Sequence, residues 1–200
     1  MKLINLFASL LACFLPPPTN HAGKQTQKIN IEQGKIKRDL NTCVEMILSP
    51  KNKPMLFPND WFLNDPKEHV STYFLDYVLV AREKNQTIGM ITFDASQKKD
   101  QTASINLLVV DEQYHRRGIG TLLMQNALAA IKNERTILTV YKYNHAARNL
   151  YKKLGFTDET NGGIQIDDND PLLILEHWQE GATPVITRKK VQHEIHFDRL

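Results

Sequence analysis

Cysteine is scarce in this chain of 200 residues, which contains only Cys13 and Cys43. Cys13 lies in an N-terminal segment that has the features of a leader, so Cys43 would stand alone once that segment is removed. A disulfide within the chain is then excluded, and a cysteine-based metal cluster is equally disfavoured. We therefore expect no metal and interpret Cys43 as a core residue.

Strong charge of either sign is also missing. The formal net charge at pH 7 is +3, and no run of lysines and arginines is interleaved with aromatic residues. Nucleic-acid binding therefore has little support from the composition. With 42% hydrophobic and 24% charged residues, the chain is long enough for one globular domain and too short for a second full domain.

No apolar run is long enough to cross a membrane, and the run Leu3–Leu15 ends at three consecutive prolines. Together with the lysine at position 2, this run makes residues 1–22 resemble a secretory signal peptide, with Ala22 before the cleavage site. Two alternatives stay open. Residues 10–13 resemble a lipoprotein box, which would place a lipid anchor on Cys13, or the segment is a misassigned start or an uncleaved tail.

The most informative stretch of the sequence is Leu107–Met124. Branched apolar residues at 107–110 predict a buried strand, and glycines at 118 and 120 open an amphipathic helix. The first N–H groups of a helix have no partner within it and together carry about half a positive charge. Arg116 and Arg117 add two cations beside these amides. The stretch predicts a diphosphate-binding site, although a tight strand-to-helix connection would also contain such glycines.

Two familiar nucleotide-binding patterns do not fit this stretch. A dinucleotide fingerprint needs a third glycine where Leu123 stands, and a Walker loop needs Gly-Lys-Ser/Thr. Residues 109–123 instead resemble the coenzyme A segment of the GNAT acyltransferase family, whose pattern is Gln or Arg, two residues, Gly, one residue, then Gly or Ala. His115 occupies the Gln or Arg position, which departs from the family pattern.

A second stretch, Asn144–Phe156, resembles the other signature of the same family, Asn-x-x-Ala-x-x-Leu-Tyr-x-Lys-x-Gly-Phe. Its spacing alone predicts a short helix that is capped by Asn144 and ended by Gly155. The two stretches occur in the family's order, and the resemblance covers residues 28–178.

Helical and alternating patterns elsewhere predict the remaining elements. These are a strand at 27–32, a helix at 35–48, a proline-rich loop at 49–66, a helix that begins at Asp65 and has Tyr77 on its apolar face, a hairpin of strands 77–82 and 86–94, strands at 102–110 and 135–142, and a closing hairpin at 156–160 and 172–178. The proline-rich loop is either a covered core edge or, as the resemblance implies, a wall of the acceptor site. Residues 179–200 would be a solvated tail or an added edge strand.

The resemblance implies an α+β fold of the α/β type, with a mixed six- to seven-stranded sheet, about four helices, and splayed fourth and fifth strands. It also implies acetyl-CoA as cosubstrate, with its pantetheine arm between those strands and its diphosphate on the glycine loop. The residues implied to hold it are Val109, Val110, His115, Arg116, Arg117, Gly118, Ile119, Gly120, Thr121, Asn144, Ala147 and Tyr151.

The chemistry implied by the family is direct attack of an amine on the thioester, with a backbone N–H near Val110 polarising the carbonyl. The leaving thiol has a pKa of about 8.5, so Tyr151 is the expected general acid; alternatively, it packs and hydrogen-bonds the ligand sulfur. Many relatives carry Glu where this chain has Asn106. Asn106 cannot act as a base but can orient a water, with Asp94, Glu176 or His177 as relay.

Two functions of different classes remain. The first is an N-acetyltransferase, monomeric or homodimeric, that acts on the primary amine of a small molecule, a peptide N-terminus or a lysine. The second is a catalytically impaired acyl-CoA-binding module that acts through protein contacts. His115 and Asn106 favour the second, whereas Tyr151 and the intact glycines favour the first. Because acetyl-CoA is cytosolic, either an exported protein works in another cell's cytosol, or the leader is not functional and the protein is cytoplasmic.

Overall fold

The computed structural model describes residues 28–57, 65–74, 77–95, 102–157 and 172–179. The segment 1–22, predicted to be a leader and containing Cys13, lies outside the described residues, and so do all but the first residue of the 179–200 extension. In the part that is described, no helix is both long and apolar enough to cross a bilayer.

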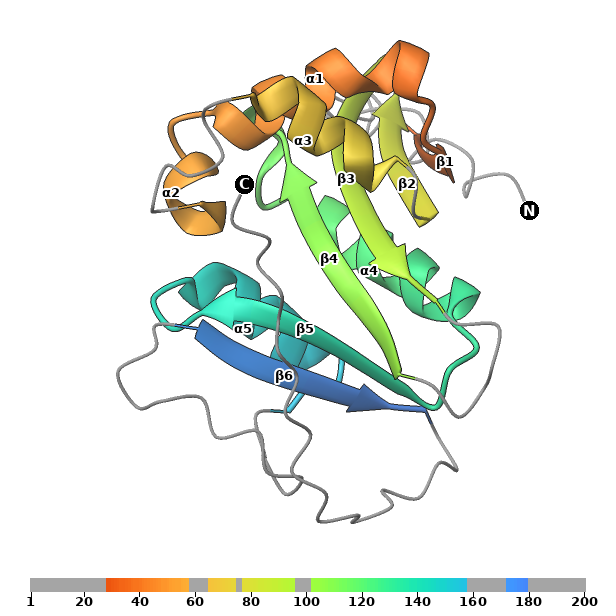
Figure 1. Ribbon diagram of the computed structural model, residues 1–200, viewed down its shortest axis with the longest axis vertical. Helices are drawn as coiled ribbons and strands as arrows, with labels where there is room; N and C mark the ends of the chain where they lie inside the picture. The colour runs from red at the N-terminus through yellow and green to blue at the C-terminus, as the bar shows by residue number, and fades with distance from the viewer. Residues whose placement is uncertain (1–27, 58–64, 75–76, 96–101, 158–171, 180–200) are drawn as a thin grey trace, which may run out of the picture.

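The described residues form a six-stranded sheet, in the order β1-β2-β3-β4-β5-β6, with helices on both faces (Figure 1). The elements in chain order are β1 (Ile29–Gln33), α1 (Ile36–Leu48), α2 (Lys53–Leu56), α3 (Pro66–Tyr73), β2 (Tyr77–Glu83), β3 (Gln86–Asp94), β4 (Thr102–Val110), a 3-10 turn (Glu112–Tyr114), α4 (Ile119–Ala130), β5 (Arg135–Tyr141), α5 (His145–Lys153) and β6 (Leu172–Trp178). All neighbouring strands are antiparallel except β4 and β5, which are parallel. The expected mixed sheet is confirmed.

The core consists of two apolar clusters, one on each face of the sheet. On one face, α1 and α3 cover strands β2 to β4, and Cys43 is fully buried there, as predicted. On the other face, α4 and α5 cover strands β2 to β6, with Ile119 and Tyr151 among the buried residues. The sheet is therefore the middle layer of three.

β4 contains one residue more than β3 at its centre. Thr92 pairs with Leu107 and Phe93 pairs with Ile105, so Asn106 has no partner of its own on β3. Such a bulge bends the strand, increases its twist and exchanges the two faces beyond it. Accordingly, Ile105 packs in the cluster beneath α4, whereas Leu107 packs in the cluster beneath α1 and α3.

The bulge is also where β4 and β5 separate. Their parallel pairing runs from Thr102 opposite Arg135 to Ile105 opposite Leu138 and stops there. Beyond these residues the two strands diverge, and Figure 1 shows their carboxyl ends well apart. The expected splay is confirmed, and the extra residue at position 106 gives its physical reason.

Three details of the predicted elements differ from the structure. The proline-rich loop contains a short helix, α2, because Pro54 occupies the first turn, where its missing N–H has no consequence. Tyr77 begins β2 instead of extending the preceding helix. Of the predicted strand at 156–160, only Thr157 pairs with β6, opposite Glu176, and residues 158–160 lie outside the described part.

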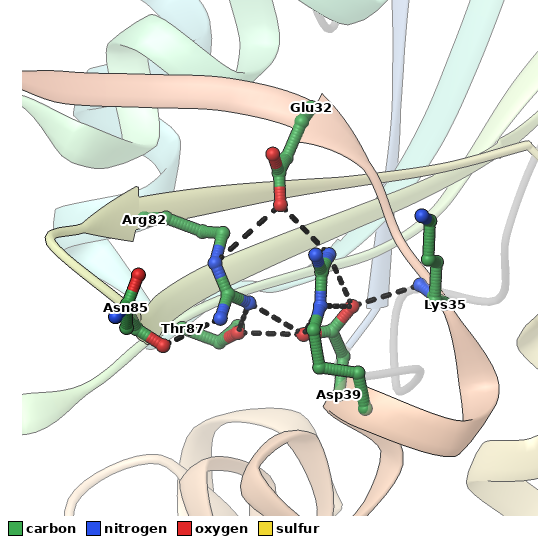
Figure 2. Close-up of polar contacts among 7 residues, drawn as sticks. Glu32, Lys35, Asp39, Arg82, Asn85 and Thr87 are labelled. Carbon is green, nitrogen blue, oxygen red and sulfur yellow. Dashed lines mark hydrogen bonds and ion pairs between the residues drawn. The ribbon is translucent and has the colours of Figure 1, made fainter.

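A buried carboxylate, Asp39 of α1, ties this helix to the β2–β3 hairpin (Figure 2). It accepts hydrogen bonds from the Lys35 backbone N–H at 2.8 Å, from Arg82 Nη1 at 2.7 Å and from Thr87 Oγ1 at 2.8 Å. The Arg38 guanidinium donates to the same carboxylate. Burial alone would raise the pKa of Asp39, but the hydrogen bonds from Arg38, Lys35 and Thr87 together hold this pKa below its usual value.

We expect Asp39→Asn to lower the free energy of unfolding by up to about 3–5 kcal/mol, because it removes the buried carboxylate bound to Arg82 and leaves only the more exposed Glu32, 3.4 Å from Arg82 Nε, as its counter-charge. The lowered pKa of Asp39 contributes stability above its unfolded pKa of about 3.9, and this contribution is lost as the pH falls through the folded value. Urea denaturation between about pH 3 and pH 7 tests both points. An Asp39→Asn protein that loses as much stability with acid as the parent would contradict the assignment.

Candidate active site

The loop between β4 and α4 presents a row of free backbone donors. Among the described residues, no group accepts a hydrogen bond from the N–H groups of residues 116–121, and the first helical bond runs from Leu122 N–H to the Gly118 carbonyl. Two residues of this row, Arg116 and Gly118, have left-handed φ angles of 64° and 78°. Alternating conformations of this kind turn successive amides toward one concave site that binds anions. The predicted diphosphate site therefore has the donors that it needs.

The two glycines of the loop serve different purposes. A Cβ built on Gly118 would meet no atom within 4 Å, so the space before these amides is open, and its positive φ favours glycine. A Cβ on Gly120 would lie 3.3 Å from Leu150 Cδ2 of α5 and 3.9 Å from the side chains of Leu108 and Val110. Gly120 thus lets α4, α5 and the end of β4 meet closely.

The carboxyl end of β4 offers backbone groups to the gap between β4 and β5. The Asp111 N–H donates to the Ile88 carbonyl of β3, so alternation along the antiparallel ladder turns the backbone groups of Leu108 and Val110 away from β3. On that side β5 no longer pairs with β4. Of the two residues predicted to hold the pantetheine arm, Val110 therefore turns its backbone groups toward β5, whereas Val109 turns its own toward β3; Leu108 is the other residue on the β5 side.

The Val110 carbonyl is already held by two side chains. Asn52 Nδ2 donates to it at 2.8 Å and also donates to the Met46 carbonyl at the end of α1 at 2.8 Å. His115 Nε2 lies 3.0 Å from the same carbonyl, and because a carbonyl only accepts, this nitrogen carries the proton. His115 therefore contacts the strand end, which leaves the N–H of Val110, rather than its carbonyl, for a ligand.

Arg117 was expected to bind the diphosphate, but in the structure its charge is already paired with a carboxylate. Its Nη2 forms an ion pair of 2.5 Å with Glu83 Oε1 of β2, and its guanidinium lies 4.9 Å from the centre of the Tyr114 ring. The neighbouring Arg116 is exposed and has no such partner among the described residues. The cation that is free for an anionic ligand is therefore Arg116.

Tyr151 of α5 lies in the cluster that lines the gap between β4 and β5. Its side chain is 7% exposed, it contacts Phe156, and its hydroxyl has no hydrogen-bond partner among the described residues. Burial raises the pKa of Tyr151 to about 12, so the phenol is neutral at physiological pH. A neutral hydroxyl without a partner among the described residues, on a largely buried side chain, is suited to donate a hydrogen bond or a proton to a ligand.

The predicted coenzyme contacts on α5 also serve the helix itself. Asn144 Oδ1 accepts a hydrogen bond from the Ala147 N–H at 3.1 Å and so caps α5, as its sequence predicted. Ala147 is half-buried and packs against the same cluster as Tyr151. The cap sets where α5 begins and thus where Tyr151, two turns later, lies.

Asn106, the bulge residue, is exposed, and its Oδ1 accepts a hydrogen bond from Ser104 Oγ at 2.8 Å. Among the three residues proposed to relay the proton, Asp94 lies nearest to Asn106 along the sheet, because it is the cross-strand partner of Ser104. Glu176 is held in an ion pair of 2.5 Å with Arg135. Asp94 is therefore a carboxylate near Asn106 that forms no ion pair with a described residue. Glu176 differs because Arg135 already holds its carboxylate.

His177 is separated from the predicted acid by another ring. Phe156 lies between the two, with its centroid 5.2 Å from that of His177 and 5.9 Å from that of Tyr151. Burial lowers the pKa of His177. No three His, Cys, Asp or Glu side chains in the described part of the chain are grouped so that they would hold a metal ion.

Two residues that shape the site were missed by the sequence analysis. Asn52 lies in a proline-rich stretch, and Glu83 lies at the end of an ordinary strand, so neither belongs to a motif. Their partners are 58 and 34 residues away along the chain. Only the register of the hairpin and the fold of the loop bring them to the site.

Comparison with known proteins agrees with this geometry. The model of the acetyltransferase (GNAT) family matches residues 41–156. An N-alpha-acetyltransferase of Sulfurisphaera tokodaii is 32% identical over 131 residues, which is 58% of this chain and 71% of the relative. The PaiA N-acetyltransferase of Thermoplasma acidophilum, solved in complex with coenzyme A, has a TM-score of 0.57 at 21% identity and covers 76% of this chain and 99% of its own.

Ard1 of Thermoplasma volcanium is similar to a comparable degree, with a TM-score of 0.58 at 18% identity over 75% of this chain and 97% of that one. At these identities, the similarity to the two structures supports the fold alone. The family match spans more than half of the chain, and with the curated relative it shows that this protein is an acetyltransferase enzyme that belongs to the GNAT family.

Proposed function

We propose that this enzyme transfers the acetyl group of acetyl-CoA to a primary amine by direct attack in a ternary complex. The observation that carries the proposal is the row of unpaired amides at residues 116–121, which adjoins the splay between β4 and β5. The open space at Gly118 and the exposed Arg116 fit a diphosphate, and the backbone of Leu108 and Val110, which β5 no longer pairs with, would hold an extended arm directed toward Tyr151.

The mechanism assigns one task to each group of the chain. The amides of the loop bind the diphosphate, and the backbone N–H groups of Leu108 and Val110 hold the arm and polarise the thioester carbonyl. Tyr151 donates a hydrogen bond and then its proton to the departing sulfur. Because an amine with a pKa of about 10.4 is mostly protonated at pH 7, a water held by Asn106 takes its proton and passes it toward Asp94.

For the acceptor, we propose the N-terminal amine of a peptide ahead of a lysine or a small amine. The support is the curated relative named N-alpha-acetyltransferase, of which this chain covers 71%. An N-terminal amine has a pKa of about 7.7–8.0, so it needs much less help from a base than a lysine does. Asparagine in place of glutamate at position 106 fits such an acceptor better than it fits a lysine.

The test is calorimetric titration of the purified protein with coenzyme A, followed by turnover on a panel of peptides, lysine-containing peptides and small amines. We expect binding, and acetylation of free peptide N-termini in preference to lysines. Binding without turnover on any amine would favour the alternative, a coenzyme-binding module that acts through protein contacts. Absence of both would refute both functions.

Replacement of Arg116 by glycine should separate binding from stability. The change removes the free cation and should weaken coenzyme A binding by about fivefold. An exposed charge pair contributes up to about 1 kcal/mol, which corresponds to that factor. It also relieves the left-handed φ of 64°, so the free energy of unfolding should stay equal or rise by up to about 1 kcal/mol. Calorimetry and urea denaturation measure the two effects.

The control for this change is Lys132→Gln, which alters the charge equally just beyond the far end of α4. Its binding should match the parent, and the Arg116→Gly effect should shrink at 0.5 M salt, where the screening length is only about 4 Å. Equal losses in both variants would mean that only the net charge matters.

A further inference from the structure

The glycine loop is supported from the β2–β3 hairpin by two side-chain contacts. Glu83, whose side chain is 9% exposed, pairs with Arg117 at 2.5 Å. Tyr114, which lies under the Arg117 guanidinium, donates from its hydroxyl to Gln86 Oε1 at 3.4 Å. These contacts are the polar side-chain links that the described part of the chain provides between loop and hairpin, beside the apolar packing of Ile119 against β3.

The hairpin is itself fixed on its other side. Arg82, the residue before Glu83, is bound to the buried carboxylate of Asp39 and donates through Nη2 to the Asn85 carbonyl in the turn at 2.5 Å (Figure 2). Neighbouring side chains of a strand point to opposite faces, so Arg82 anchors the strand while Glu83 reaches the loop. Glu83 is therefore held on a rigid support.

The loop needs such a support because little holds it from within. Six consecutive N–H groups have no acceptor among the described residues, and two residues have left-handed conformations. In the absence of an anion, aligned amide dipoles repel one another, and the loop gains freedom if it opens. An external anchor at Arg117, the second residue of the row, opposes this opening.

We propose that Glu83 is a positioning residue of the coenzyme site, which acts through Arg117 to hold the amides of residues 116–121 in the arrangement that binds the diphosphate. The inference rests on the proposed function. It also explains why one arginine of the pair is committed to a carboxylate while Arg116 stays exposed.

Simple electrostatics predicts the opposite effect for loss of Glu83. Removing a negative charge near an anion site should strengthen binding slightly, and the Arg117 side chain, 42% exposed, is well screened by solvent. The positioning role predicts weaker binding. The sign of the change therefore decides between the two.

The experiment compares the parent with Glu83→Gln by calorimetry, with coenzyme A and with its 3′-phosphorylated ADP half, which lacks the pantetheine arm. We expect the affinity for each ligand to fall by about tenfold, because both carry the diphosphate. The matched control is Glu45→Gln, which makes the same charge change at an exposed position of α1 and should leave both affinities unchanged.

A second variant, Arg117→Gln, removes the same ion pair from its exposed side. If Glu83 acts through Arg117, the double variant should bind no more weakly than Arg117→Gln alone. This variant also keeps the test valid if Glu83→Gln fails to fold. A purely structural role would lower the urea midpoint of Glu83→Gln without changing either affinity.

Three outcomes would overturn the inference: unchanged or tighter binding by Glu83→Gln, a loss for coenzyme A but not for its ADP half, or additive losses in the double variant. Each of these leaves the proposed function intact, since the parent still binds coenzyme A. Failure of the parent itself to bind coenzyme A would instead remove the proposed function, and this inference with it.

Discussion

Replacement of Gly120 by glutamate is expected to abolish coenzyme A binding, with a loss of affinity of at least about 100-fold. The new side chain would start 3.3 Å from Leu150 and point into the junction of α4, α5 and β4. Two unit charges about 5 Å apart repel by about 3 kcal/mol at an effective dielectric constant of 20, and about 1.4 kcal/mol corresponds to a factor of ten. The carboxylate would also neutralise the positive end of α4.

Two variants at the same position separate charge from size. Gly120→Ala adds one carbon whose tight contact is with the flexible end of Leu150, while Leu108 and Val110 lie at ordinary contact distance, so binding should change by less than about threefold. Gly120→Gln has the size of glutamate without its charge and should lie between the two. Calorimetry with coenzyme A gives all three values, and circular dichroism shows whether the fold is kept. Equal losses for Gln and Glu would argue against an anion at this helix end.

The glycine loop and the capped helix α5 could be predicted from the sequence because their chemistry is local. Gly118 has its positive φ, Asn144 caps α5, and Gly155 ends the segment with a φ of 84°. Each of these depends on residues within a few positions of one another. The periodicities of β2 to β5 and of α1 likewise predicted these elements with bounds that differ by only a residue or two from the structure.

Features that depend on pairing between distant segments could not be predicted. The bulge at Asn106 follows from the register of β4 against β3, which the β4 sequence, alternating up to Asn106 and continuously apolar from Leu107, does not specify. Arg117 looked like a free cation because its partner, Glu83, is 34 residues away. Asp39 is a single acid in an amphipathic helix, and only the fold shows that Arg82 and Thr87 surround it.

Tyr151→Phe is the second change for which a large effect is expected, a fall in kcat of about 10²–10³-fold with the affinity for coenzyme A nearly unchanged. Phenylalanine fills the same space against Phe156, so the fold should tolerate it. Because burial raises the pKa of Tyr151 to about 12, we expect no fall of kcat from this group between about pH 6 and pH 10. Steady-state kinetics across that range, with the peptide on which the parent is most active, gives both results.

A phenol with a pKa of about 12 looks like a poor acid for a thiolate whose pKa in water is about 8.5, since the gap of about 3.5 units amounts to roughly 5 kcal/mol. Burial, however, raises the pKa of a thiol as well, as it does for Cys43 in the core on the other face of the sheet. Burial, together with the nearby Asp39 carboxylate, raises the pKa of the Cys43 thiol to about 12. A donor sulfur enclosed beside Tyr151 would be raised for the same reason, which brings acid and leaving group close to balance, the condition under which proton transfer is most efficient. A Tyr151→Phe enzyme that kept its kcat would show that the leaving thiolate is protonated by water and that the hydroxyl serves only to pack against the ligand.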